Sequence, residues 1–111
     1  MTTRSAVTTH VLDTTLGRPA QGIGVLLQRS DGATVAKGST DGDGRITDLG
    51  PERLDTGTYR IVFDTAGYFA ATGQHGFYPE VVVTFTLADA TQHHHVPLLL
   101  SPFAYSTYRG S

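Results

Sequence analysis

Histidine is the residue type best suited to catalysis in this chain of 111 residues, which contains five histidines. His93, His94 and His95 are consecutive, and His10 lies near the start of the chain. A neutral imidazole is an effective general base near neutral pH, provided that a partner holds it in place. Cysteine is absent, so the chain has no thiolate nucleophile. The histidines therefore predict acid–base chemistry.

Zinc binding is an alternative use of the same histidines. His93 and His95 are two residues apart and would share one face of a strand, and His10 would approach from a neighbouring strand. Three histidine ligands with an open water position are typical of a catalytic zinc site. The spacing permits this arrangement without specifying it. For each histidine taken alone a structural role is the simplest interpretation, so we expect no metal and no cofactor.

Charged groups in two further segments are candidates for a functional site: Arg45 after a turn, and Arg109 with the α-carboxylate at the end of the chain. Arg45 follows the turn sequence Asp41-Gly42-Asp43-Gly44, which lacks the third acidic ligand and the bidentate glutamate of a calcium loop. Taken alone, Arg45 is expected to be solvated beside this turn. The last residues keep a strand pattern with tyrosines, although chain ends usually fray. We infer that Arg109 and the α-carboxylate of Ser111 are held in place.

The elements that must position these residues are strands. Period-two alternation with turn signals between segments recurs, and helical periodicity is nearly absent. Strands are expected over residues 6–12, 22–30, 33–40, 45–48, 57–64, 79–88, 93–100 and 103–109. One short helix is expected over 66–72, with Asp64 or Thr65 as N-cap and Gly73 as C-cap. The length fits one domain, residues 1–111, built as an all-β sandwich of two packed antiparallel sheets.

The alternation also predicts which side chains face the core. On the core face we expect Val7, Thr9 and Val11 of the first strand, and His94, Val96, Leu98 and Leu100 near the end. On the outer face we expect Thr8, His10 and Leu12, and His93, His95, Pro97 and Leu99. An outer face that mixes histidine with leucine and proline suits burial against another subunit, with a polar cleft between them. We therefore expect the chain to assemble with copies of itself.

Charge and hydropathy exclude several classes of function. The net charge is -2 and the pI is about 6.1, so the chain lacks the basic stripe that nucleic acid requires. Apolar runs such as 81–83 and 98–100 are far too short to cross a bilayer. The N-terminal residues show no apolar signal segment. We expect a cytoplasmic protein that binds neither nucleic acid nor membrane.

Four segments together resemble the 5-hydroxyisourate hydrolases, which are the transthyretin-related enzymes of urate breakdown. The segments are TTHVLD at 8–13, Gly44-Arg45, HHHVPLLLSP at 93–102 and Tyr108-Arg109-Gly110-Ser111. The terminal tetrapeptide is the most specific, since it separates these enzymes from transthyretin itself. The resemblance covers essentially the whole chain. Thr8 stands where the family often has serine, and His94 and Ala104 stand where tyrosine and glycine are common.

The resemblance implies a transthyretin-like sandwich of two four-stranded antiparallel sheets, assembled as a homotetramer with sites between subunits. It implies hydrolytic ring-opening of the cyclic amide of 5-hydroxyisourate in purine catabolism. The implied catalytic residues are His10, His95 and Arg45. The implied substrate-binding residues are Arg45, Tyr108, Arg109, Gly110 and Ser111. Which histidine activates water and which orients the water or substrate stays open.

Three alternatives remain. A transthyretin-type carrier would bind a small ligand in the same sandwich without catalysis. A β-sandwich interaction module is the second, because residues 40–45 and 57–60 also resemble carboxypeptidase regulatory-type domains. A zinc hydrolase that uses the same histidines is the third.

Overall fold

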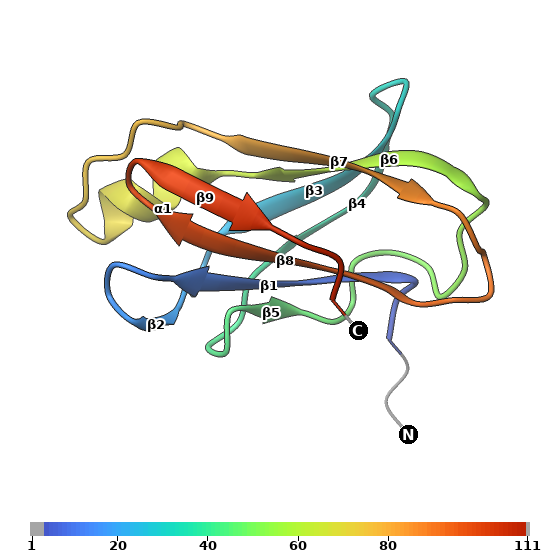
Figure 1. Ribbon diagram of the computed structural model, residues 1–111, viewed down its shortest axis with the longest axis horizontal. Helices are drawn as coiled ribbons and strands as arrows, with labels where there is room; N and C mark the ends of the chain where they lie inside the picture. The colour runs from blue at the N-terminus through green and yellow to red at the C-terminus, as the bar shows by residue number, and fades with distance from the viewer. Residues whose placement is uncertain (1–3, 111) are drawn as a thin grey trace.

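The computed structural model describes residues 4–110 and forms a sandwich of two β-sheets with one short helix (Figure 1). The first sheet contains β1 (Val7–Asp13), β2 (Arg18–Pro19), β5 (Arg45–Ile46), β8 (His94–Ser101) and β9 (Ala104–Thr107). Its order is β2-β1-β8-β9, and β5 also pairs with β1. The second sheet has the order β4-β3-β6-β7, from β3 (Gly24–Arg29), β4 (Thr34–Ser39), β6 (Gly57–Phe63) and β7 (Val81–Leu87). The predicted all-β sandwich is confirmed.

One strand pair departs from the predicted antiparallel pattern. β1 and β8 run parallel, from Val7 opposite His94 to Asp13 opposite Leu100. The prediction of wholly antiparallel sheets is wrong for this pair. Parallel neighbours need a long crossover, and the chain between β1 and β8 contains the whole second sheet. The first sheet also has five strands instead of four, because the two-residue strands β2 and β5 both pair with β1.

The core lies between the two sheets and follows the predicted alternation. The side chains expected on the core face of β1 and β8 are all buried, namely Val7, Thr9, Val11, His94, Val96, Leu98 and Leu100. From the second sheet, Leu27, Ile61 and Phe63 are fully buried against them. His10, His95 and Leu99 are only half-buried, as expected for the outer face. The hydrophobic effect on one face thus orients the histidines on the other.

Helix α1 (Thr65–Ala71) anchors the end of β1. Its N-cap is Asp64, whose carboxylate accepts from the Gly67 amide at 3.1 Å. The helix ends one residue earlier than predicted, at the C-cap Thr72, and Gly73 follows with φ of +70°. Nothing helical within residues 4–110 has the length and apolar composition needed to cross a bilayer.

A buried carboxylate joins this helix to the first sheet. Asp13, the last residue of β1, accepts from the Tyr68 hydroxyl at 2.6 Å and from Gln74 Nε2 at 3.1 Å. The amides of Thr15 and Leu16 donate to its other oxygen. Burial raises the pKa of Asp13, but these hydrogen bonds, led by that from Tyr68, outweigh burial and lower the pKa overall. The charged carboxylate therefore fixes the strand that carries His10.

Candidate functional site

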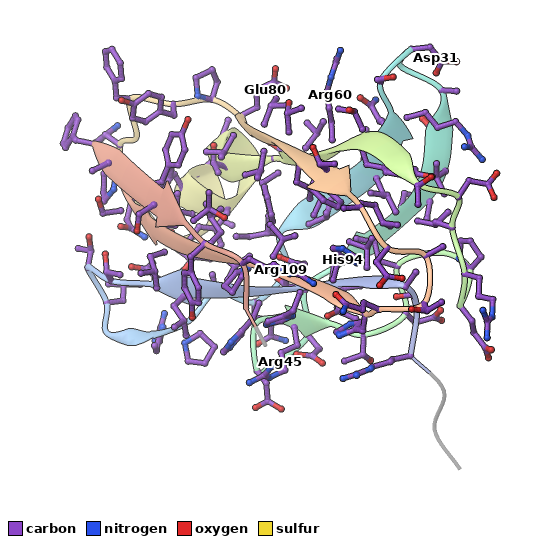
Figure 2. The ribbon with its side chains drawn as sticks, turned by 45° about the vertical axis from the view of Figure 1, so that its right-hand side comes forward. Asp31, Arg45, Arg60, Glu80, His94 and Arg109 are labelled. Atoms are coloured by element: carbon purple, nitrogen blue, oxygen red, sulfur yellow. The ribbon has the colours of Figure 1, made fainter. Side chains whose placement is uncertain are left out.

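Strand pairing brings three of the predicted site residues to one surface. His10 on β1 lies opposite Arg45 on β5 and opposite Pro97 on β8. His95 pairs with Thr8, two residues before His10, so the two histidines are diagonal neighbours on adjacent strands. Residues in register point to the same face of a sheet, so His10, Arg45 and His95 share the outer face of the first sheet. In Figure 2, Arg45 lies on the outer side of this sheet and His94 lies between the sheets.

A tight turn holds Arg45 beside β1. The Asp41 carboxylate accepts from the amides of Asp43 at 2.8 Å and Arg45 at 3.0 Å. These donors, the Arg45 amide first, lower the pKa of Asp41. Gly44 has φ of +73°, and its carbonyl accepts from the Val11 amide at 2.7 Å. A Cβ at Gly44 would collide with the Val11 carbonyl. The turn that resembles a calcium loop therefore positions Arg45.

A threonine hydroxyl joins two of the histidines. Thr8 Oγ1 lies 2.8 Å from His95 Nδ1 and 2.9 Å from His93 Nε2. The rings of His93 and His95 are nearly parallel, with centroids 6.3 Å apart. Thr8 is only 4% exposed although it lies on the outer face. The alternation along β1 predicts Thr8 on this face, but no site role was predicted for it. Its position two residues before His10 was the available signal.

The surroundings of His93 and His95 favour their neutral forms. Burial lowers the pKa of His95, and the positive charge of Arg45 is the next cause, with smaller effects from His10 and Arg4. Burial also lowers the pKa of His93, and Arg4 adds to this effect. A lowered pKa increases the neutral fraction near pH 7. The neutral form is the one with a free lone pair on the ring, which a general base requires.

The C-terminal segment continues from β9 along the same edge of β8, in the same antiparallel register (Figure 1). Gly110 forms an antiparallel bridge with His95, and its amide donates to the His95 carbonyl at 2.8 Å. Ser111, a predicted site residue, lies outside the described residues. The glycine of the terminal tetrapeptide is thus brought to His95.

Tyr108 and Arg109 line a hollow that they share with His95, but not with His10 and Arg45. The hollow has a volume of about 270 Å³ and lies between β7 and the strands β8 and β9. Arg109 donates to Gln92 Oε1 at 2.9 Å, and Tyr108 is 58% exposed. The described tail residues therefore all lie near His95: Gly110 is bonded to its backbone, and Tyr108 and Arg109 line a hollow that His95 also lines.

The zinc alternative requires His10, His93 and His95 to converge. Within residues 4–110, no group of three or more histidine, cysteine, aspartate or glutamate side chains is placed to hold a metal ion. Instead, one ring nitrogen of His93 and one of His95 are turned toward the Thr8 hydroxyl. This part of the chain lacks the geometry of a three-histidine zinc site.

The sheet order, the parallel β1–β8 pair and the histidines on the outer face define a transthyretin-like β-sandwich. The chain belongs to the HIUase/Transthyretin family, whose family model matches residues 7–110. It is 47% identical over 116 residues to "5-hydroxyisourate hydrolase" of Mus musculus, an alignment that covers 99% of this chain and 98% of that protein.

Solved structures that share this fold include a hydrolase and a transthyretin. The 5-hydroxyisourate hydrolase of Klebsiella pneumoniae has a TM-score of 0.88 and 35% identity, with 95% of this chain and 97% of that chain covered. Sea bream transthyretin, solved in complex with thyroxine, has a TM-score of 0.88 and 32% identity, with 95% and 94% covered. Since an enzyme and a carrier share the sandwich, the fold alone does not assign function.

Proposed function

We propose that this protein hydrolyses 5-hydroxyisourate in purine catabolism. The observation that carries the proposal is its end-to-end similarity to 5-hydroxyisourate hydrolases, with 47% identity to the mouse protein. The shared face of His10, Arg45 and His95 supplies groups suited to this chemistry. The fold is equally compatible with a carrier, because the hydrolase and transthyretin structures match with the same TM-score of 0.88 and with 35% and 32% identity.

The reaction opens the six-membered ring by attack of water on its carbonyl carbon. It needs a base for the water, donors for the developing oxyanion and a proton for the leaving nitrogen. We assign water activation to His95, because its surroundings keep the imidazole neutral. His10 then orients the water or the substrate. The planar guanidinium of Arg45 offers paired donors to the flat, acidic ring and to the oxyanion.

The tail completes the pocket in this proposal. Gly110 and Ser111 contact the substrate beside His95, since the Gly110 amide is bonded to the backbone of that residue. We also assign Tyr108 and Arg109 to substrate binding, and propose that they act by holding the tail in place. The bond from Arg109 to Gln92 ties the tail to the loop before β8.

We infer that the sites lie between the subunits of a homotetramer. On the outer face, the half-buried pair Leu12 and Leu99 lies next to His10 and Pro97. Large apolar side chains are also exposed in the single chain, including Phe103 at 72%. Such a surface suits a second subunit. Analytical ultracentrifugation should give a tetramer at micromolar concentration, and a fully active monomer would refute the inference.

We also propose that residues 1–111 act as one domain in the cytoplasm. The absence of cysteine fits a reducing compartment. Cell fractionation in the source organism tests the location, and recovery of the protein with membranes or secreted material would contradict it.

A coupled ultraviolet assay tests the function. Urate oxidase generates 5-hydroxyisourate from urate in the cuvette, and its decay is followed with and without the protein. We expect faster decay than the spontaneous reaction, and a loss of about 100-fold or more in His95→Ala and in His10→Ala. His75→Ala is the matched control, because His75 is exposed in the segment between α1 and β7. Unchanged decay with a folded oligomer would favour the carrier.

A further inference from the structure

The contact between Thr8 and the two histidines restricts where protons can lie. A threonine hydroxyl carries one proton, so it donates to only one ring nitrogen and must accept from the other. Thr8 Oγ1 lies within hydrogen-bond distance of both His95 Nδ1 and His93 Nε2. Two arrangements satisfy both contacts. Either His95 Nδ1–H donates to Thr8 and Thr8 donates to His93, or the whole chain of bonds is reversed.

The two arrangements give His95 opposite chemical roles. In the first, the proton of neutral His95 is on Nδ1, and Nε2 presents a lone pair that can take a proton from water. In the reversed arrangement Nε2 carries the proton and cannot act as a base. The tautomer of His95 is therefore set by the direction of the bonds through Thr8.

The surrounding charges favour the first arrangement. Arg45 is the charged side chain with the largest effect on His95, and a guanidinium has donors only. Because Nδ1 is already paired with Thr8, Nε2 is the ring nitrogen left to interact with this charge, which stabilises a lone pair there and not an N–H. His93 is part-buried and tends to be neutral, so its Nε2 is able to accept from Thr8.

We propose that Thr8 and His93 are positioning residues that hold His95 in the tautomer with a free Nε2 lone pair. His95 Nδ1–H donates to Thr8 Oγ1, and the Thr8 hydroxyl donates to His93 Nε2. His93 acts through Thr8 and does not touch the substrate. This inference rests on the proposed function, because it assigns a purpose to the base form of His95.

Two pairs of variants at positions 8 and 93 test the inference. Thr8→Ser keeps the hydroxyl and Thr8→Val removes it at similar size. His93→Gln keeps an acceptor near the position of Nε2, and His93→Leu removes it. Nitrogen NMR of isotope-labelled histidine in the free protein distinguishes a protonated from an unprotonated ring nitrogen without using substrate.

The expected results separate a tautomeric role from a structural one. In the wild type and in Thr8→Ser, His95 should have a protonated Nδ1 and an unprotonated Nε2. In Thr8→Val the Nε2–H tautomer should become populated, and kcat should fall about five- to tenfold with KM nearly unchanged. His93→Leu should behave in the same way, and His93→Gln should recover most of the loss.

Two results would overturn the inference. One is a wild-type His95 that carries its proton on Nε2, and the other is a Thr8→Val protein with unchanged tautomer or unchanged kcat. The first result would also remove water activation from His95, but neither result contradicts the hydrolysis of 5-hydroxyisourate itself. That function fails only if the wild-type protein does not accelerate the decay of 5-hydroxyisourate.

Discussion

Replacing Gly110 by alanine tests whether the C-terminal tail positions the His95 ring. A Cβ at Gly110 would lie 2.5 Å from His95 Cδ2, 3.2 Å from His95 Cγ and 3.3 Å from Pro97 Cγ. Non-bonded carbon atoms settle at about 3.5–4.0 Å. The ring and the tail must therefore separate by about 1 Å, and the imidazole is the group that catalysis requires to stay in place.

The expected loss of activity follows from this displacement. A misplacement of about 1 Å at a reacting group costs about 100-fold in rate. This corresponds to about 2.7 kcal/mol of activation free energy, at about 1.36 kcal/mol for each factor of ten. The backbone at Gly110 is not in the left-handed region, so alanine adds no backbone strain there. We expect kcat/KM to fall while the melting temperature changes little.

The coupled ultraviolet assay measures kcat/KM, and thermal unfolding reports on the fold. Gly24→Ala is a matched control in the other sheet, where an added Cβ would meet only Asp64 Cβ at an ordinary 3.8 Å. This control should keep wild-type activity. A Gly110→Ala protein with kcat/KM within about threefold of the wild type would refute the argument that the tail positions His95.

Three further predictions concern the pH dependence of activity, the stability of the fold and the binding of substrate by Arg45. Because the pKa of His95 is lowered, the acidic midpoint of kcat/KM in a pH–rate profile should lie below about pH 6.5; a midpoint above 6.5 would contradict this. Tyr68→Phe should lower the free energy of unfolding by about 1–3 kcal/mol at pH 7, as measured by denaturant titration, because Asp13 loses its shortest hydrogen bond. The pKa of Asp13 is lowered in the folded protein, so this loss should be present above about pH 4 and shrink as the pH falls further; an equal loss in strong acid would argue against the charged pair. Arg45→Lys keeps the charge but loses the paired donors, so KM should rise about tenfold with an unchanged melting temperature, and steady-state kinetics with an unaltered KM would remove Arg45 from substrate binding.

The alternation in the sequence was sufficient to predict the faces of the two strands that carry the histidines. Burial of Val7, Val11 and Leu98 on one side places His10 and His95 on the other, because side chains alternate strictly along a strand. The short helix was also predictable to within one residue, since Asp64 and Gly73 mark its ends. Of the two strands that have only two residues, β5 was predicted as residues 45–48 after its turn sequence, and β2 was missed.

The association of β1 with β8, and the direction of that pairing, came only from the tertiary structure. Strand pairing between residues more than 80 positions apart depends on how the second sheet folds between them, which local patterns do not encode. That parallel register places Thr8 against His95, and β5 adds Arg45 opposite His10. The sequence by itself therefore determined the residue types, the faces and the family resemblance. The tertiary structure decided which side chains touch, because hydrogen bonds act over about 3 Å and the separation of residues along the chain does not specify such distances.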